Sequence, residues 1–445
     1  MSGILSAPAA ERASEATVAQ SPDPTQELVL CRYCDLLQHL PALQDGEEAH
    51  CSRCGHELDA RQRESALRPI LYALSALFML VLTNLFPFVG MDAAGSHRDM
   101  TFLDTSAVLL DEDYPWLAVL VWLFIQAIPA LCMFAIIYLK LGMFYRLPAL
   151  VQVARLLYAL KPWSMVDIFL MGLLVSFVKL LTHFELSLGM SFWAFCGFCL
   201  LHLRTFQVVD RHELWSRIAP APQPVDAAVA GETGLSQQLK VCQCCTALVP
   251  LADARCSRCG SKVRARIPSS VQKTLALLVT ASILYIPANL LTMMETVSLG
   301  DSVESTIISG ILLMWADGAY PVAIVVLLAS VVVPVVKIVV MFWLCYLTTL
   351  PLSERSKHGT WIYPVVDWIG RWSMVDVLVV AILAALVRFD SLVGVYPGAA
   401  TLVFAAVVIV TMLAAMSFDP RLLWDLSPAE MEQQRDEQRG TGENS

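Results

Sequence analysis

The stretches KPWSMVDIFLMGLLVSFVKL (161–180) and GRWSMVDVLVVAILAALVRF (370–389) are nearly the same segment written twice. Each contains Trp-Ser-Met-Val-Asp, continues as a long apolar run and is closed by a cation, Lys179 or Arg388. About 17 apolar residues or more are enough to cross a membrane as a helix. The pair therefore predicts membrane spans and an internal duplication.

The composition agrees with a membrane protein. Of the 445 residues, 57% are hydrophobic and 16% are charged, whereas soluble domains have about 25% charged residues. Apolar runs of spanning length predict an α-helical polytopic membrane protein with eight spans. These runs are 66–88, 115–140, 163–183, 191–209, 272–294, 320–348, 372–388 and 395–416.

The duplication extends over both halves of the chain. TNLFP (83–87) aligns with ANLLT (288–292), and Pro129 aligns with Pro334, in each case 205 residues apart. Each proline falls inside an expected span, where neighbouring helices tolerate a kink. Four spans per half is an even number, so both halves would insert in the same direction as parallel repeats of a four-helix unit.

Loop charges predict the orientation. Lys and Arg gather in alternate loops, and the loops between them are acidic. By the positive-inside rule, both termini would be cytoplasmic. We expect seven segments: a disordered N-terminus (1–27), a first ribbon (28–60), a first membrane unit (61–216), a linker (217–239), a second ribbon (240–266), a second membrane unit (267–425) and a disordered tail (426–445).

A cysteine box precedes each membrane unit. Two C-x-x-C turns place four thiolates around one ion, which is the ligand set of a tetrahedral four-cysteine site. Gly55 and Gly260 follow the second pairs and suit the left-handed residue that closes such a turn. The expected ligands of the first box are Cys31, Cys34, Cys51 and Cys54, and those of the second are Cys242, Cys245, Cys256 and Cys259.

These boxes predict two small four-cysteine zinc ribbons, each holding one structural zinc ion. A closed shell of four cysteines leaves no open position for catalysis. Unmetallated thiols and an iron site are the alternatives, and Cys244 stands beside Cys245 as a less well spaced ligand. Neither box has a basic, aromatic-rich face, so nucleic-acid binding is not expected.

Tandem ribbons, a WSMVD segment in each half and the closing FDPRLLWD (418–425) together resemble the paraquat-inducible protein A family. CRYCDLLQHLP (31–41) and YIPANLL (285–291) are similar to motifs of its lipophilic envelope-spanning tunnel protein A branch. The resemblance covers nearly the whole chain from Leu28 to Asp425.

The resemblance implies an inner-membrane protein of Gram-negative bacteria with cytoplasmic ribbons. It implies a periplasm-spanning partner with MCE (mammalian cell entry) domains, forming a hexameric tube, and movement of phospholipids between the two membranes. It further implies that polar membrane residues matter for transport, with Lys179 and Thr411 at such positions. Thr182 stands about where an acidic residue would be expected, a departure from the pattern.

Charged and polar residues within the spans are the candidates for a lipid path. Lys337 is the most informative, because it lies well inside its span while its repeat counterpart is Cys132. A cation near a helix end can also simply anchor the span by reaching the headgroups. The full candidate set is Lys179, Ser176, Thr182, Lys337, Ser330, Arg388, Thr411, Asp167 and Asp376.

The expected function is a non-enzymatic lipid-transport subunit. A passive membrane anchor for the MCE tube is a second hypothesis. A thiol or quinone redox protein using Cys196 and Cys199 is a third, but His183 and His202 would lie too far apart to bind one haem iron. No phosphate-binding G-x-x-x-x-G-K-[ST] loop is present in the sequence, so no ATPase site is expected within it.

Overall fold

The computed structural model describes most of the chain between Leu28 and Asp425. The described residues are 28–60, 67–180, 185–219, 228–350, 388–389 and 393–425, except 42, 45, 94–95, 104–106, 108–109, 111–114, 299–300, 317 and 319. The predictions for both terminal segments, for Thr182, for Asp376 and for nearly all of the span at 372–388 lie outside these residues.

The first half alternates long helices with short strands. In chain order it contains α1 (Arg68–Leu85), β5 (Pro87–Ala93), β6 (Ser96–Thr101), α3 (Pro115–Trp122), the π-helical turn η2 (Leu123–Ala127), α4 (Ile128–Tyr145), α5 (Leu150–Leu160), η3 (Lys161–Trp163), α6 (Val166–Leu180), β7 (Glu185–Leu188), α7 (Met190–Val208) and α8 (Arg211–Ile218).

The second half follows the same order as far as it is described. It contains α9 (Ser270–Leu290), β10 (Met294–Ser298), β11 (Asp301–Ser305), α10 (Ile307–Ala316), α11 (Tyr320–Leu327), the π-helical turn η4 (Leu328–Val332), α12 (Val333–Leu347), β12 (Arg388–Phe389), β13 (Val393–Pro397), α15 (Ala399–Ser417) and η5 (Pro420–Leu423).

The two π-helical turns occupy equivalent positions, 205 residues apart. Each directly precedes a helix whose second residue is a proline, Pro129 in α4 and Pro334 in α12. A proline has no N–H and its ring clashes with the carbonyl four residues earlier, so the preceding turn must widen. Both prolines lie inside apolar helical segments, as expected, and the widened turn before each is a finding of the structure.

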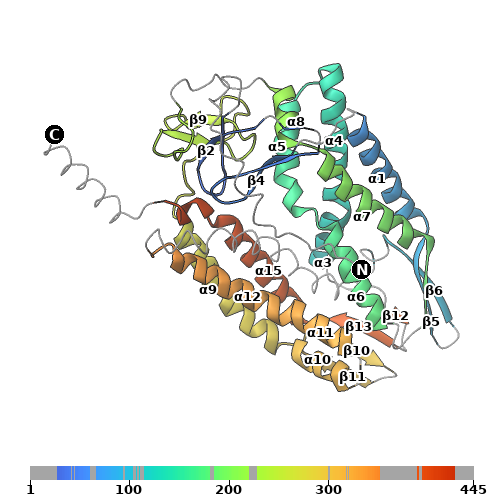
Figure 1. Cartoon of the computed structure of the whole chain (residues 1–445). Helices are drawn as coiled ribbons and strands as arrows, with labels where there is room; N and C mark the ends of the chain where they lie inside the picture. Colours follow the sequence, from blue (N-terminus) through green and yellow to red (C-terminus); the bar gives the residue numbers. More distant parts are fainter. Residues whose placement is uncertain are drawn as a thin grey trace, which may run out of the picture.

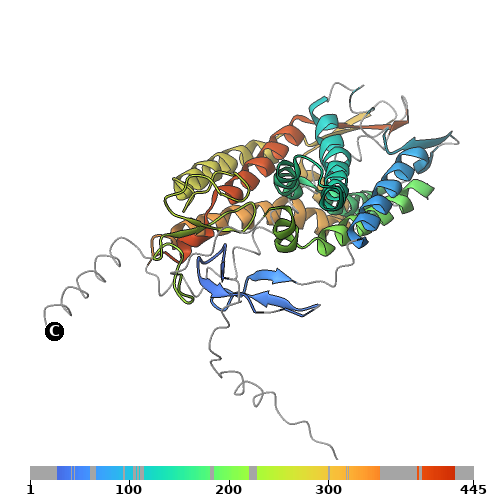
Figure 2. The same cartoon turned by 90° about the horizontal axis from the view of Figure 1, so that it is seen from above.

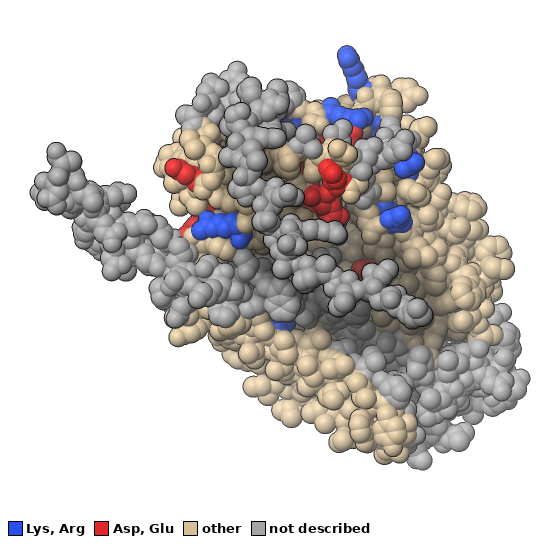
Figure 3. All heavy atoms as spheres, in the orientation of Figure 1, with Lys and Arg blue, Asp and Glu red and all other residues tan. Residues whose placement is uncertain are grey.

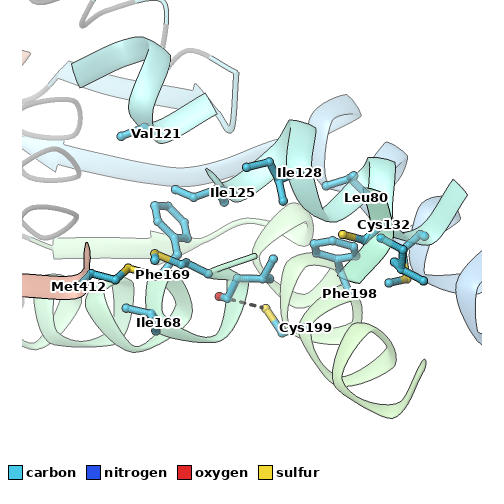
Figure 4. Close-up of a cluster of buried hydrophobic side chains, with 14 of the residues drawn as sticks. Leu80, Val121, Ile125, Ile128, Cys132, Ile168, Phe169, Phe198, Cys199 and Met412 are labelled. Atoms are coloured by element: carbon cyan, nitrogen blue, oxygen red, sulfur yellow. Dashed lines mark hydrogen bonds between the residues drawn. The ribbon is translucent and has the colours of Figure 1, made fainter. Parts of the chain in front are cut away.

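Within each half, the first helix packs most extensively against the last one. α1 lies along α7 and α4, and α9 lies along α15 and α12. The two halves lie beside each other (Figures 1 and 2). Figure 4 shows one place where they meet, with Met412 of α15 next to Ile168 and Phe169 of α6.

A small antiparallel sheet follows the first helix of each half. β5 pairs with β6 and β7 in the first half, and β10 pairs with β11 and β13 in the second. β12 extends the second sheet through β13. Both sheets lie at the end of the helices opposite to the ribbons (Figure 1). The sequence predicted acidic loops at these positions but not the strands.

Fewer than the eight expected spans are found in the described part of the chain, and nearly all of the span expected at 372–388 lies outside that part. Among the described residues, six helices are long and apolar enough to cross a membrane, or seven if α7 and α8 form one span bent by 63°. Charged side chains gather at the ribbon end in Figure 3, and the described helical body below them is nearly free of charge on that face. The chain is therefore a helical membrane protein, and a complete pair of four-helix units stays a prediction.

Candidate metal centres and membrane polar residues

The first four-cysteine cluster lies between two short hairpins, β1 (Leu28–Leu30) with β2 (Leu37–His39), and β3 (Glu48–His50) with β4 (Glu57–Ala60). The Sγ atoms of Cys31 and Cys54 are 3.5 Å apart, as are those of Cys34 and Cys51. All four sulfur atoms lie within 4.8 Å of one another. The predicted ligand set is thus brought together.

The second cluster follows β8 (Leu239–Val241), which pairs with β9 (Leu248–Pro250). Sulfur to sulfur, Cys242 and Cys259 are 3.4 Å apart, and Cys245 and Cys256 are 3.5 Å apart. Cys244 is not part of the group. The structure therefore resolves the choice between the two neighbouring cysteines in favour of Cys245.

All four cysteine turns have the same backbone form. The N–H of the residue after each pair donates to the carbonyl of the first cysteine, for example Gly55 to Cys51 at 2.8 Å and Gly260 to Cys256 at 2.9 Å. Both glycines have positive φ, +68° and +70°, as predicted. Asp35 and Thr246 take the same left-handed conformation despite their Cβ atoms, which costs about 1 kcal/mol or more.

The clusters fit a tetrahedral metal ion. Zn–S bonds of about 2.3 Å would place ligand sulfurs about 3.8 Å apart, close to the separations found here. Within the second cluster, hydrogen bonds with Cys242 and Cys245 lower the pKa of the Cys256 thiol, and hydrogen bonds with Cys242 and Cys256 raise the pKa of the Cys245 thiol. Each shell is closed by four sulfurs, which suits a structural site and not a catalytic one.

Neither ribbon packs mainly on the membrane unit that directly follows it in the chain; each packs on the other unit, an arrangement we call crossed. The first ribbon packs on the second unit, where Cys31, Cys34 and Cys51 share a core with the ends of α9, α12 and α15. The Arg53 guanidinium lies 4.6 Å from the ring centre of Trp424, just after η5. The sequence placed each ribbon ahead of a unit but contained no sign of this crossing.

Arg266 forms ion pairs with two aspartates where the first ribbon meets the second unit. Its Nη2 atom is 2.9 Å from Oδ2 of Asp35 in the first ribbon and 2.6 Å from Oδ1 of Asp425 after η5. Its Nε also donates to Asp425, at 2.7 Å. The Asp35 side chain is 2% exposed. One guanidinium, at the last residue of the second ribbon, thus joins the first ribbon to the segment that follows η5 in the second unit.

The second ribbon is held by the first unit. Arg211 at the start of α8 donates from Nε to the carbonyl of Cys244 at 3.0 Å, and from Nη2 to the carbonyls of Gln243 and Cys244. Arg258 donates to the carbonyl of Ala219, just beyond α8, at 3.3 Å. The crossing is therefore reciprocal.

Two of the predicted membrane residues meet in the second unit. Nζ of Lys337 in α12 donates to Oγ1 of Thr411 in α15 at 3.2 Å, and both residues are 2% exposed. Thr411 donates in turn to the carbonyl of Val408 at 2.9 Å. Ser330 in η4 is also buried.

The other predicted polar residues are more scattered. Asp167 is exposed near the start of α6, and Ser176 and Lys179 lie further along that helix, where only the backbone is described. Arg388 was expected to close a helix, but it lies in strand β12 and pairs with Gly394. That expectation is wrong because the residue takes part in sheet pairing, which a period-3.6 pattern does not reveal.

A further polar pair in the first unit was missed. Oγ of Ser164, from the WSMVD segment, is 2.9 Å from Nε2 of buried His202 in α7. His202 and Thr411 are 209 residues apart, the spacing of the WSMVD segments, so each unit has a buried polar residue at this point of its last helix. Cys199 donates to the carbonyl of Val166 at 3.8 Å (Figure 4), which is a packing role.

Comparison with known proteins gives the family. The sequence pattern of the family described as paraquat-inducible protein A matches the chain twice, over residues 67–219 and 271–427. The intermembrane transport protein PqiA of Escherichia coli strain K12 is 46% identical over 90% of this chain and 96% of its own. No solved structure matches the chain.

Two other relatives are more distant. The lipophilic envelope-spanning tunnel protein A of Escherichia coli is 30% identical over 89% of this chain and 90% of its own. A probable intermembrane transport protein of Haemophilus influenzae is 27% identical over 91% and 97%. The chain is thus more similar to PqiA than to the tunnel protein branch that its short motifs had favoured. The chain belongs to the paraquat-inducible protein A family.

Proposed function

We propose that this protein is an inner-membrane subunit of an intermembrane transport system, which passes phospholipids between the inner membrane and a hexameric, periplasm-spanning MCE-domain tube. Relatives that match it over about nine-tenths of its length are named as intermembrane transport proteins or as an envelope-spanning tunnel protein. These names describe transport, so we assign the chain no catalysed reaction. The partner and the lipid substrate follow from the family resemblance.

The buried Lys337–Thr411 pair is the observation that carries a transport role. An ammonium within membrane helices is costly and is retained mainly in substrate or ion pathways. The pair sits inside the second unit, between α12 and α15. The repeat counterpart of Lys337 is Cys132, so the fold itself does not need a lysine there. We assign Lys337, Thr411 and Ser330 to the transport path, together with Lys179, Ser176, Thr182, Arg388, Asp167 and Asp376 from the predicted set.

Zinc is the metal we assign to both four-cysteine clusters. Four thiolates in a closed tetrahedral set are its usual structural site. The ribbons would lie in the cytoplasm, and the two sheets at the other end of the helices would face the periplasm and the partner. This orientation follows from the loop charges. It requires an even number of spans, and we keep the predicted eight, with the seventh ending before Arg388 of β12.

A photo-crosslinking amino acid at Ser330, which is 3% exposed, tests whether lipid enters the protein interior. Cells carrying this variant would be irradiated in the presence of labelled phospholipid. Leu328, in the same turn and 48% exposed, is the matched position facing the surrounding lipid. We expect an adduct at Ser330 that falls severalfold in Lys337→Met, and an adduct at Leu328 that does not change.

The absence of any adduct at Ser330 above background, with normal labelling at Leu328, would contradict an internal lipid path through this unit. The protein would then be better described as a membrane scaffold for the MCE tube. An adduct at Ser330 that does not depend on Lys337 would place lipid in the interior but remove the lysine from its path.

A further inference from the structure

Helix α10 has an apolar face on both sides. Ile307 and Ile311 turn inward and are 6% and 8% exposed, whereas Ile308, Leu312 and Trp315 turn outward and are between 50% and 64% exposed. The ten residues of this helix rise about 15 Å, half of a hydrocarbon core, so α10 is too short to cross a membrane. Its outer face nevertheless has the character of a membrane helix.

Hydrogen bonds within the segment close both ends of α10. Before the helix, the N–H of Thr306 donates to Oγ of Ser309 at 2.8 Å, and the N–H of Ser309 donates back to Oγ1 of Thr306 at 3.2 Å. After it, the N–H of Gly318 donates to the carbonyl of Trp315 at 3.2 Å. Such ends suit a helix in contact with lipid, because hydrocarbon offers the backbone no hydrogen-bond partners.

Aromatic side chains indicate the level of α10 relative to the membrane. Trp315 lies against Tyr320 at the start of α11, with ring centres 5.1 Å apart, and both side chains are half exposed. Trp343 and Tyr346 are exposed near the end of α12. Tyr320 and Trp343 are 23 positions apart in the sequence, which is about 35 Å of helix, close to the hydrocarbon thickness of about 30 Å. The two aromatic pairs therefore match the two headgroup belts.

The outer face of α10 is continuous with the membrane-facing surface of the second unit. α10 packs along α11 (Figure 1), where Ile324 and Leu327 are exposed, and the exposed Leu328 of η4 follows. On the side of α10 that comes first in the chain, β11 exposes Ser302 and Glu304. The boundary between polar and apolar surface thus lies where α10 begins.

The corresponding stretch of the first half is less apolar. With the 205-residue offset of the repeat, α10 aligns with FLDTSAVLLD (102–111), in which Asp104, Thr105 and Ser106 stand in a row. The sequence of α10, IISGILLMWA, has no charged residue. The duplicated fold therefore does not require so apolar a helix, and the unit that has it is the one with the buried lysine–threonine pair.

We propose that α10 lies in the plane of the membrane, sunk into the periplasmic leaflet, with its outer face against phospholipid acyl chains. Helices of this kind insert their apolar face about 5–10 Å into the boundary between headgroups and chains. A docked protein could also cover such a face, but the surface beside it belongs to a membrane-spanning segment, and Trp315 lies at the headgroup level. The periplasmic side rests on the orientation proposed above, whereas the lipid contact does not.

Photo-crosslinking in cells that contain labelled phospholipid tests the lipid contact on the full-length protein. The crosslinking amino acid is placed at Leu312, the more exposed leucine of α10. Leu328 is the positive control on a spanning segment, and Ser302 on β11 is the matched exposed position outside the apolar surface. We expect labelling at Leu312 close to that at Leu328 and severalfold stronger than at Ser302. Lys337→Met should leave the Leu312 adduct unchanged, so failure of the internal lipid path would not alter this result.

The side of the membrane is measured separately with Ser302→Cys. A membrane-impermeant maleimide is added to intact spheroplasts, and the wild-type protein gives the background from its native cysteines. We expect the same reaction before and after permeabilisation. Reaction only after permeabilisation would overturn the periplasmic assignment of α10 and of the sheet beside it.

Lipid labelling at Leu312 no stronger than at Ser302 would overturn the proposal. A protein adduct at Leu312 without a lipid adduct would show that a partner covers this face instead. If the Leu312 variant does not accumulate, Ile308 provides the same comparison, because it lies on the same face and is 52% exposed.

Discussion

At the scale of one residue, Lys337 and its hydrogen bond to Thr411 are the main polar feature found inside the described membrane helices of the second unit. The position of Lys337 within an apolar run marked it as unusual, and the structure adds a partner on another helix, 74 residues away. The Thr411 hydroxyl accepts from the lysine and still donates to the carbonyl of Val408. Removing the lysine therefore leaves the donor of this hydroxyl satisfied.

Lys337→Met is expected to fold normally and to lose transport. The methionine fills a similar volume and leaves no buried charge, so the thermal midpoint should shift by only about 1–3 °C, within the range of volume-conserving swaps. Phospholipid transfer between labelled and unlabelled vesicles, with the partner reconstituted, measures the loss. Val339→Met, on the exposed side of α12, is the control. Wild-type transfer by Lys337→Met would remove this lysine from the transport path.

At the scale of the element, a glycine precedes the last long helix of each half and touches the backbone that follows the first helix. Gly189 precedes α7 and Gly398 precedes α15, and a Cβ atom on either would overlap a backbone carbonyl, of Pro87 or of Thr292. The N–H of Gly189 donates to Phe88 at 3.1 Å, and that of Gly398 donates to Met293 at 2.9 Å. The same close approach of backbone to backbone thus occurs twice.

Gly189→Ala and Gly398→Ala are each expected to destabilise the protein by about 2–4 kcal/mol, because a rigid backbone carbonyl must move to admit the methyl group. Gly197→Ala is the control in the body of α7, where a Cβ atom would meet only Met79 at 3.6 Å. Alanine there should be neutral or stabilising by up to about 1 kcal/mol. Thermal unfolding in one detergent compares the three variants, and equal midpoints would contradict the clash.

At the scale of the whole molecule, the crossed ribbons tie the two halves together. The first ribbon is anchored to the second unit through Asp35, Arg266 and Asp425, and Arg211 anchors the second ribbon to the first unit. Neither ribbon can move away without breaking contacts to a unit distant from it in the chain. We therefore expect the ribbon end of the molecule to unfold as one body.

Arg266→Gln tests this arrangement. It leaves the buried carboxylate of Asp35 without its cation, a change that typically costs about 3–5 kcal/mol. Hydrogen exchange should increase together in the first ribbon and in residues 418–425. Arg217→Gln removes an exposed pair with Glu213 on α8 and should cost less than about 1 kcal/mol. Faster exchange confined to one of the two segments would show that they are not coupled.

The sequence by itself determined the features that depend on near neighbours in the chain. Apolar runs predicted membrane helices, and the prolines marked equivalent positions in the two halves. C-x-x-C spacing with its following glycine predicted both cysteine clusters, because a turn of four residues sets its own geometry. The repeat also directed attention to Lys337, since Cys132 occupies the matching position.

Only the tertiary structure decided which surfaces meet. Three tertiary contacts are the pairing of Lys337 with Thr411, the pairing of Ser164 with His202, and the packing of each ribbon on the more distant unit. The hydrogen bonds and ion pairs that make them join residues more than 30 positions apart, the shortest separation being 33, from Arg211 to Cys244. The short strands were missed because their pairing partners lie in other segments. Because the chain is duplicated, each ribbon has two similar membrane units on which it could pack. The residue spacing within a ribbon does not show which of the two it will contact. The choice rests on the summed burial and ion pairing of each interface, such as that of Arg266, which exist only once the halves are assembled.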